Sequence, residues 1–201
     1  MRERLNGKFF KKLYKILTVF LAVCWVAMGI AILGRVVLRS YFYPVRYKEE
    51  VFEYADYYGL ERALVFSVIK VESGFNEDAK SHAGAVGLMQ ITEDTGAYIA
   101  SKLGVENYNL TDVKTNINFG CYYIKYLFLR FKDMNTALIA YNAGEGNVSL
   151  WLMNNEYSDD KITLKSIPFN ETRDYIKKIN ENFSKYKKLY GNILDKPKNF
   201  E

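Results

Sequence analysis

The sequence predicts a mainly α-helical protein in which one N-terminal transmembrane helix precedes a single helical domain. Three observations support this prediction. Residues 16–33 form a run of 18 residues without a charged side chain. Past residue 44, apolar residues recur at three- and four-residue spacing, and glycines or capping residues separate the runs. Signals for strands are scarce, and 201 residues suffice for one domain with a core plus an appendage.

The uncharged run at 16–33 is close to the ~20 residues that a helix needs to cross a membrane. A cleaved signal peptide is the alternative, but the run exceeds the usual apolar core and no small-x-small cleavage site follows Leu33. Six Lys/Arg lie in residues 1–15 and four in the fifteen residues after the run, which favours a cytoplasmic N-terminus. We therefore expect a basic cytoplasmic segment at 1–15, a single-pass anchor at 16–33, a linker at 34–44 and the remaining chain outside.

The net charge of +5 is unevenly distributed along the chain. Residues 1–40 contain eight Lys/Arg against Glu3 alone, a charge of +7, so residues 41–201 carry −2. The basic character belongs to the N-terminal segment and does not support a nucleic-acid-binding surface. Two cysteines, Cys24 and Cys121, make no disulfide framework, and the single His82 cannot build a His-rich metal site. We expect no metal, no cofactor and no nucleic-acid partner.

Residues 45–190 read as a series of helices, followed by a tail at 191–201. The first expected helix ends before Gly59, the second covers 64–69 and can be capped by Gly74, and the third runs from Thr92 through Lys102. A central buried helix is expected over 115–131, and a short helix over 135–143 before Gly144. We expect Asn170 to cap a last helix that continues towards Gly191. Residues 161–168 can pair briefly as a strand.

Glu72 is placed where an apolar stripe should continue. Val65, Val68 and Ile69 precede it by seven, four and three residues, so Glu72 shares their helix face. A carboxyl group half-buried among apolar groups has a raised pKa, and a proton held near neutral pH suits a general acid. The plainer interpretation is an exposed C-terminal helix end. From spacing alone the two interpretations are equally supported.

Three further motifs have both a plain and a functional interpretation. The stretch GAVGLMQ at 84–90 is either an ordinary turn into a helix or a backbone that approaches a ligand closely, with Gln90 as a hydrogen-bonding group. The stretch AYNAG at 140–144 exposes Tyr141 and Asn142 at a helix end, which alone is most often a cap. Glu171 most simply favours a helix N-terminus next to Asn170.

Together these motifs resemble one family. The blocks ESGFN at 72–76, SxxGAxGLMQI at 81–91 and AYNAG at 140–144 are similar, in order and spacing, to the catalytic domain of the soluble lytic transglycosylases, in the goose-lysozyme-like superfamily. The segment SIPFNETRDYIKKI at 166–179 resembles the closing segment of the same family. The resemblance covers residues 45–190, and four separate blocks make it specific. It implies a lysozyme-like helical domain that acts on peptidoglycan.

Two positions depart from the family pattern. The family often has a Met-Pro pair after the Met-Gln-Ile block, where this chain has Thr92-Glu93, and it commonly has proline where Glu145 stands. Both positions are peripheral to the matched functional residues. They bear on loop shape rather than on activity.

The resemblance implies how one carboxylate can work without a second. Most glycosidases use two carboxylates ~5–5.5 Å or ~6.5–9.5 Å apart, but the acidic residues nearest to Glu72 in sequence lie in segments that read as solvated: Glu77, Asp78, Glu93 and Asp94. By resemblance, Glu72 protonates the glycosidic oxygen between N-acetylmuramic acid and N-acetylglucosamine while the muramic acid's acetamido oxygen supports the cation. The ionised Glu72 then takes the proton of the same sugar's 6-hydroxyl, which closes a 1,6-anhydro ring.

The resemblance also implies the substrate-binding residues: Ser81, Met89, Gln90, Tyr141, Asn142 and Glu171. The expected partner is the glycan strand of peptidoglycan, which lies outside the membrane. Two alternatives stay open. A goose-type lysozyme-like hydrolase would use a similar glutamate but deliver water. An inactive wall-binding scaffold of an envelope machine would depend mainly on the anchor, but it need not keep an acid on an apolar face.

Overall fold

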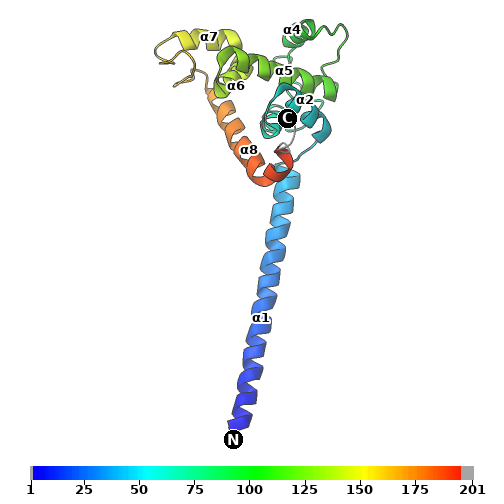
Figure 1. Cartoon of the computed structure of the whole chain (residues 1–201), viewed down its shortest axis with the longest axis vertical. Helices are drawn as coiled ribbons and strands as arrows, with labels where there is room; N and C mark the ends of the chain where they lie inside the picture. Colours follow the sequence, from blue (N-terminus) through cyan, green and yellow to red (C-terminus); the bar gives the residue numbers. More distant parts are fainter. Residues whose placement is uncertain (1, 196–201) are drawn as a thin grey trace. The chain divides into compact units, whose positions relative to one another are not determined.

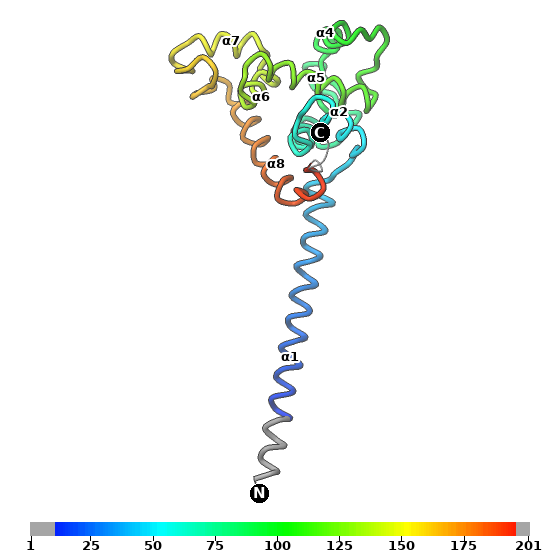
Figure 2. The backbone as a smooth tube through the Cα atoms, viewed as in Figure 1, coloured from blue at the N-terminus to red at the C-terminus, as the bar shows by residue number. Residues whose placement is uncertain are grey.

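The computed structural model describes residues 2–195, with side chains from residue 11 onward, and the chain forms two compact units that divide between Pro44 and Val45. Helices dominate both units (Figure 1; Figure 2). Within the described residues there is no strand, and the extended pairing consists of isolated bridges from Val86 to Lys80 and to Ile91. The predicted mainly α fold class is confirmed.

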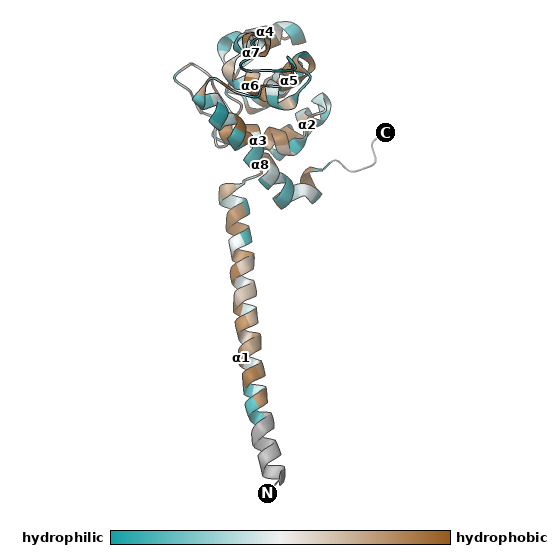
Figure 3. Cartoon of the chain, turned by 90° about the vertical axis from the view of Figure 1, so that its left-hand side faces the viewer, coloured by the Kyte–Doolittle hydropathy of each residue, from teal (hydrophilic) through white to brown (hydrophobic). Residues whose placement is uncertain are grey.

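The first unit is a long apolar helix. Helix α1 spans Arg2–Val37, and the π-helix η1 spans Leu38–Phe42, so helical structure extends past both ends of the uncharged run at 16–33. Large apolar side chains are exposed along it, and Figure 3 shows hydrophobic colouring over much of its length. By length and composition, Lys11–Phe42 is the one helical stretch in the described chain that could cross a membrane.

The second unit packs its helices around α5. Within residues 45–195 the helices are α2 (Lys48–Tyr58), α3 (Arg62–Glu72), α4 (Glu93–Leu103), α5 (Val113–Phe131), α6 (Met134–Ala143), α7 (Glu145–Met153) and α8 (Asn170–Leu194). Helix α5 packs against α2, α4 and α6, whereas α8 packs against α3 and α6. Figure 2 shows α8 as the long C-terminal helix at the edge of this unit.

Capping residues explain several helix boundaries. Thr92 accepts a hydrogen bond from the Thr95 N–H at the start of α4, and Gly59 takes a left-handed conformation after α2, as the sequence predicts. The prediction that Asn170 caps the last helix is wrong. Phe169 is the N-cap of α8, and the Asn170 side-chain oxygen accepts from the Arg173 guanidinium instead.

Two other segments differ from the sequence prediction. Helix α7 was not predicted, because its apolar and polar residues do not separate onto two faces. Residues 161–168 form a loop, so the predicted strand pairing is wrong. The reason is local: the Asp160 carboxylate accepts the N–H groups of Ile162 and Thr163, at 2.8 and 2.7 Å, and these donors are then unavailable to a partner strand.

Two buried groups of side chains fix the helices that carry the site. Phe66 of α3 stacks on Tyr186 of α8 with ring centroids 5.7 Å apart. A second cluster joins α5, α6 and α7 through residues that include Leu127, Ala140 and Trp151. Because α3 ends at Glu72 and α6 carries Tyr141, this packing determines where both side chains lie.

Candidate active site

Glu72 is the last residue of α3, and its helix face is buried as predicted. Val65, Val68 and Ile69 are fully buried on that face, and Glu72 itself is partly buried. Burial raises the pKa of Glu72 to about 7 from an ordinary value of 4.5, and a hydrogen bond from Tyr175 opposes part of this rise. Among residues 11–195, no lysine or arginine forms an ion pair with Glu72. The carboxyl group therefore holds its proton near neutral pH.

Tyr175 is the hydrogen-bond partner of this carboxyl group. It lies on α8 and is buried, and its hydroxyl donates to Glu72 Oε1 at 2.7 Å across 103 positions in the sequence. Burial, followed by the nearby Glu72 charge, raises the pKa of Tyr175 well above its ordinary value, so its hydroxyl remains a donor. Sequence reasoning missed this residue. Its position on the buried stripe of α8, one turn after Glu171, was the signal that could have found it.

The loop between α3 and α4 is tied to α5 by Asn116, a second residue that sequence reasoning missed. Asn116 is buried, and its amide oxygen accepts from the Met89 N–H at 2.7 Å. Its amide nitrogen donates to the carbonyls of Val86 and Leu110, at 2.9 and 2.7 Å. A polar residue among the apolar residues Ile117 and Phe119, in the mostly apolar helix at 115–131, was the available signal. These bonds give hydrogen-bond partners to backbone N–H and C=O groups of the loop, and they fix the position of the loop beside α3.

Two glycines allow the loop to approach α5 this closely. Gly87 has φ +79°, and a Cβ there would overlap the Asn116 side-chain amide. A Cβ on Gly120 of α5 would overlap the Met89 side chain. Gly87 of the GAVGLMQ stretch is thus explained by contact with α5 rather than by approach to a ligand, whereas a Cβ on Gly84 would meet open space.

Ser73 connects the end of α3 to the same loop. Its hydroxyl lies 2.9 Å from the Leu88 carbonyl, to which it donates, and it accepts from the Phe75 N–H at 3.2 Å. The residue immediately after Glu72 is therefore fixed from both sides. This arrangement limits how far the Glu72 backbone can move.

Tyr141 and Met89 are brought together next to Glu72. The Tyr141 hydroxyl donates to the Met89 carbonyl at 2.7 Å. Burial and then the Glu72 charge raise the pKa of Tyr141 well above its ordinary value, which indicates that the phenol and the carboxyl group are neighbours. Met89 is buried as a whole residue, and its carbonyl and N–H are bonded to Tyr141 and Asn116, so it supports the loop from inside.

Ser81 and Gln90 make their hydrogen bonds inside the loop. Ser81 is exposed, and its hydroxyl accepts from the Ala85 N–H at 3.0 Å. The Gln90 amide donates to the carbonyls of Ala79 and Gly87, at 3.1 and 2.8 Å. Both bonds are made by the amide nitrogen of Gln90, and its side-chain oxygen takes no part in them. Both side chains shape the loop that borders Glu72.

Asn142 and Glu171 lie together at a second position, where α6 ends and α8 begins. Thr172 donates to the Asn142 side-chain oxygen at 2.8 Å. Asn142, Phe169 and Glu171 line a cleft of about 450 Å³. Glu171 is exposed and precedes Tyr175 by four residues on α8, which is ~6 Å along the helix axis. The cleft therefore lies within about one helical turn of the Glu72–Tyr175 pair.

The other acidic residues near Glu72 in sequence do not join it. Glu77, Asp78, Glu93 and Asp94 are exposed, and Glu77 accepts from the Tyr47 hydroxyl at 3.2 Å. Within the described part of the chain, no group of three or more His, Cys, Asp or Glu side chains could hold a metal ion. The arrangement at Glu72 suits proton transfer by one carboxyl group.

Comparison with known proteins gives consistent matches over the second unit. The model of a family described as the transglycosylase SLT domain matches residues 49–164. The soluble lytic murein transglycosylase of Escherichia coli (strain K12) is 32% identical over 161 residues, 77% of this chain and 24% of that protein. Membrane-bound lytic murein transglycosylase C of Haemophilus ducreyi is 30% identical over 166 residues, 70% of this chain and 45% of that protein.

A solved structure gives the same result. An inactive mutant of the lytic transglycosylase Slt from Pseudomonas aeruginosa matches with a TM-score of 0.66 and 29% identity, over 73% of this chain and 24% of that one. The chain thus spans about a quarter of the length of the relatives from Escherichia coli and Pseudomonas aeruginosa. The family model's match ends at residue 164, before α8, so Glu171 and Tyr175 lie outside it.

Proposed function

The chain belongs to the transglycosylase SLT domain family, and we propose that it is a membrane-anchored lytic transglycosylase of peptidoglycan. It would cleave the β-1,4 bond between N-acetylmuramic acid and N-acetylglucosamine and leave 1,6-anhydromuramic acid ends. Its relatives are lytic murein transglycosylases, both soluble and membrane-bound, which supports this activity. The observation that carries the proposal is Glu72, a partly buried carboxyl group with a pKa of about 7 and a tyrosine donor.

In the first step Glu72 acts as the general acid. Its proton passes to the oxygen that links the two sugars, and the bond from the muramic acid C1 to that oxygen breaks. The acetamido oxygen of the same muramic acid supports the positive charge that develops at C1. A pKa of about 7 suits this step, because much of the group is protonated at neutral pH while proton donation stays favourable.

In the second step the ionised Glu72 acts as the general base. It takes the proton of the muramic acid's 6-hydroxyl, whose oxygen then bonds to C1 and closes the anhydro ring. Glu72 is again protonated at the end, so no water is consumed. Tyr175 keeps its hydroxyl proton throughout and stabilises the carboxylate between the two steps.

The remaining residues have supporting roles in this proposal. Tyr141 bonds the buried Met89 carbonyl and so holds the loop beside Glu72, and Ser81 and Gln90 shape the border of the site through the same loop. Asn142 and Glu171 border the neighbouring cleft, where the Glu171 carboxylate is available to an acetamido N–H of the substrate.

The apolar helix supplies the anchor in this proposal. Lys11–Phe42 is long and apolar enough to cross a membrane, and the relative from Haemophilus ducreyi is described as membrane-bound. One such helix in the described chain implies a single pass, and the six Lys/Arg in residues 1–15 against four in the fifteen residues after the uncharged run favour a cytoplasmic N-terminus. The catalytic unit would then face the cell wall, where the substrate lies.

Mass analysis of muropeptides released from purified cell wall tests the activity. Wild-type protein should release products that are lighter by one water than hydrolysed ones and that lack a reducing end. The Glu72→Gln variant should release at least ~10²-fold less, and the Glu77→Gln variant should match wild type, because Glu77 is an exposed carboxylate that contacts Tyr47. Reducing-end products would identify a lysozyme-like hydrolase, and equal behaviour of wild type and Glu72→Gln would leave a scaffold.

A further inference from the structure

A continuous run of tyrosine rings leads from the Glu72 site to the surface. The ring of Tyr141 lies 5.6 Å from that of Tyr123, measured between centroids, and Tyr123 stacks on Tyr126 at 5.9 Å with 13° between the planes. Tyr126 meets Tyr98 of α4 at 5.5 Å. Tyr141, Tyr123 and Tyr126 are partly buried and Tyr98 is exposed, so the run opens outwards.

Polar groups gather at the outer end of this run. The Tyr126 hydroxyl donates to Glu145 Oε2 at 3.0 Å, and Arg130 Nε lies 3.4 Å from the same oxygen. The side chains of Arg130 and Glu145 are 45% and 38% exposed, so both can contact a ligand from solvent. The Lys102 ammonium lies 5.5 Å from the centroid of the Tyr98 ring and adds a further donor.

Glu145 stands at one of the two positions that depart from the family pattern. Proline is common at this position in the resembling family, and proline has no side-chain acceptor. In this chain, Glu145 starts α7 two residues after AYNA and accepts from Tyr126 of α5. The carboxylate is therefore positioned by a neighbouring helix close to the end of the motif that contains Tyr141.

Packing explains only the inner part of the run. Tyr123, Tyr126 and Tyr141 pack against the buried cluster of α5, α6 and α7, whereas Tyr98 is exposed. The outer end combines an exposed aromatic ring, a carboxylate and a guanidinium. An aromatic surface next to a few fixed polar groups is suited to a saccharide, because the ring covers the apolar face of a sugar while the polar groups bond its hydroxyl and amide groups.

We infer that Tyr98, Tyr126 and Glu145 form an additional sugar-binding subsite for the glycan strand. This inference rests on the proposed function, because the occupant is an N-acetylated sugar of the strand that reacts at Glu72, away from the bond that is cleaved. Glu145 accepts from sugar hydroxyls, and Arg130 or Lys102 donates to an acetamido carbonyl. The subsite makes the enzyme favour longer strands.

Oligosaccharide binding tests the subsite without requiring turnover. The full-length Glu72→Gln protein, in detergent, is titrated with β-1,4-linked N-acetylglucosamine oligomers of two, four and six sugars, followed by calorimetry. Affinity should rise with oligomer length. Tyr98→Leu in this background should reduce affinity for the longest oligomer by ~5–10-fold, the size of one aromatic contact, and should remove most of the gain with length. Glu145→Gln should reduce it less.

Control variants separate the subsite from general damage. Tyr57 is an exposed tyrosine that meets Tyr58 rather than this run, so Tyr57→Leu should keep the full dependence on length. Tyr126→Phe keeps the ring but loses the bond to Glu145, and it should retain more of the gain than Tyr98→Leu. Thermal unfolding of every variant identifies loss of fold.

Two results would overturn the inference. One is unchanged affinity for the longest oligomer in folded Tyr98→Leu and Glu145→Gln proteins, and the other is an equal loss for all lengths. The proposed function is judged separately, from the muropeptides that wild-type protein releases. Anhydro products combined with a length dependence that Tyr98→Leu does not alter would retain the function and reject the subsite.

Discussion

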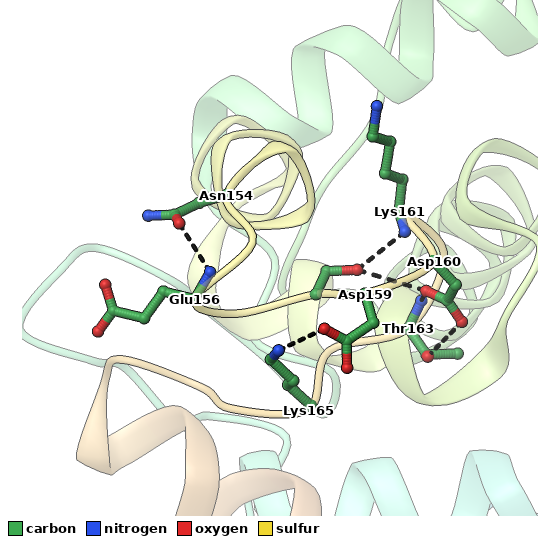
Figure 4. Close-up of polar contacts among 8 residues, drawn as sticks. Asn154, Glu156, Asp159, Asp160, Lys161, Thr163 and Lys165 are labelled. Carbon is green, nitrogen blue, oxygen red and sulfur yellow. Dashed lines mark hydrogen bonds and ion pairs between the residues drawn. The ribbon is translucent and has the colours of Figure 1, made fainter.

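Glu72 and Asp160 carry the same functional group, and their surroundings shift its pKa in opposite directions. Asp160 lies in the exposed loop after α7, where its oxygens accept from the N–H groups of Ile162 and Thr163 and from the Thr163 hydroxyl, at 2.8, 2.7 and 2.7 Å. Figure 4 shows Asp160 next to Thr163 in this loop. These donors hold the pKa of Asp160 below its usual range. Glu72 is partly buried with Tyr175 as its donor, and burial raises its pKa to about 7.

The difference shows how its surroundings prepare a carboxyl group to exchange a proton near neutral pH. Several fixed donors in contact with water stabilise the ionised form, so Asp160 is a permanent anion that shapes its loop. Removal from water with a single donor destabilises the ionised form, so Glu72 exchanges its proton near neutral pH. The first arrangement contributes to structure, and the second is available for chemistry.

The largest expected effect compares the two carboxyl groups in activity. Glu72→Gln keeps the shape of the side chain but cannot donate a proton, so the release of muropeptides should fall by at least the ~10²–10⁴-fold typical of general acid–base catalysis. Asp160→Asn should stay within a few-fold of wild type, because Asp160 lies in the loop after α7. The measurement is the initial rate of muropeptide release from purified wall. A comparable loss of rate in both variants would show that the surroundings of Glu72 do not give it a special role in the reaction.

Tyr141→Phe tests whether the surroundings of Glu72 take part in the reaction. The substitution keeps the ring and removes the hydroxyl that donates to the Met89 carbonyl. We expect turnover to fall by ~10²-fold, as when one donor is removed from an oxyanion hole. Tyr58→Phe is the control, because its hydroxyl bonds to Asn118. Equal turnover in the two variants would show that the Tyr141 hydroxyl has no part in the chemistry.

Tyr175→Phe removes the hydroxyl that donates to Glu72. The difference between the pKa of Glu72 and that of Asp160 should then increase. The Tyr175 bond lowers the pKa of Glu72, so its loss should raise that pKa further. The activity of a general acid declines as pH rises through its pKa, so this decline should move to higher pH. The rate should fall by ~10-fold, the equivalent of one hydrogen bond to a charged group.

The matched control for Tyr175 is Tyr47→Phe, which removes a tyrosine–glutamate bond on the surface, to Glu77. Its pH profile of kcat/KM should coincide with that of wild type. A profile of Tyr175→Phe that keeps its alkaline limb in place, or moves it to lower pH, would contradict the role given to Tyr175.

The stability of Glu72→Gln should depend on pH in a characteristic way. The folded pKa of Glu72 is raised above its unfolded value, so wild type loses stability as pH rises from about 4.5 to about 7. Glu72→Gln avoids this loss and should be more stable than wild type by about 3 kcal/mol above pH 7, with little difference at pH 4. Urea unfolding of both proteins at several pH values measures this difference in the free energy of unfolding. A difference that shrinks as pH rises would contradict the prediction.

Asp160→Asn should show the smallest effect and the opposite trend. The folded pKa of Asp160 is lowered, so its contribution to stability is present above the unfolded pKa of 3.8 and is lost as pH falls below it. The variant should therefore unfold at a slightly lower temperature than wild type at pH 7, and the two should converge in acid. A difference in unfolding temperature that is the same at pH 3 and pH 7 would mean that the donors do not stabilise the charged form of Asp160.

Patterns confined to neighbouring residues were readable in the sequence. The apolar run at 16–33, the capping of α4 by Thr92 and the ends at Gly59 and Gly144 all depend on contacts within a few positions. The same holds for Glu72, because a residue three, four and seven positions after apolar residues must share their helix face. Helix α7 was not predicted, because its apolar and polar residues do not separate onto two faces. The loop at 161–168 was predicted wrongly, because the residue pattern does not show that Asp160 accepts the backbone N–H groups.

What the sequence determined by itself is therefore a set of helices and one carboxyl group on a buried face. The tertiary structure alone decided that Tyr175 of α8 donates to that carboxyl group and that Asn116 of α5 holds the loop beside it. Contacts across 103 and 27 positions depend on which helices pack together and at which rotation. Periodicity predicts which face of a helix is buried but not which residues cover that face. The pKa of Glu72 depends on those covering residues, Tyr175 among them.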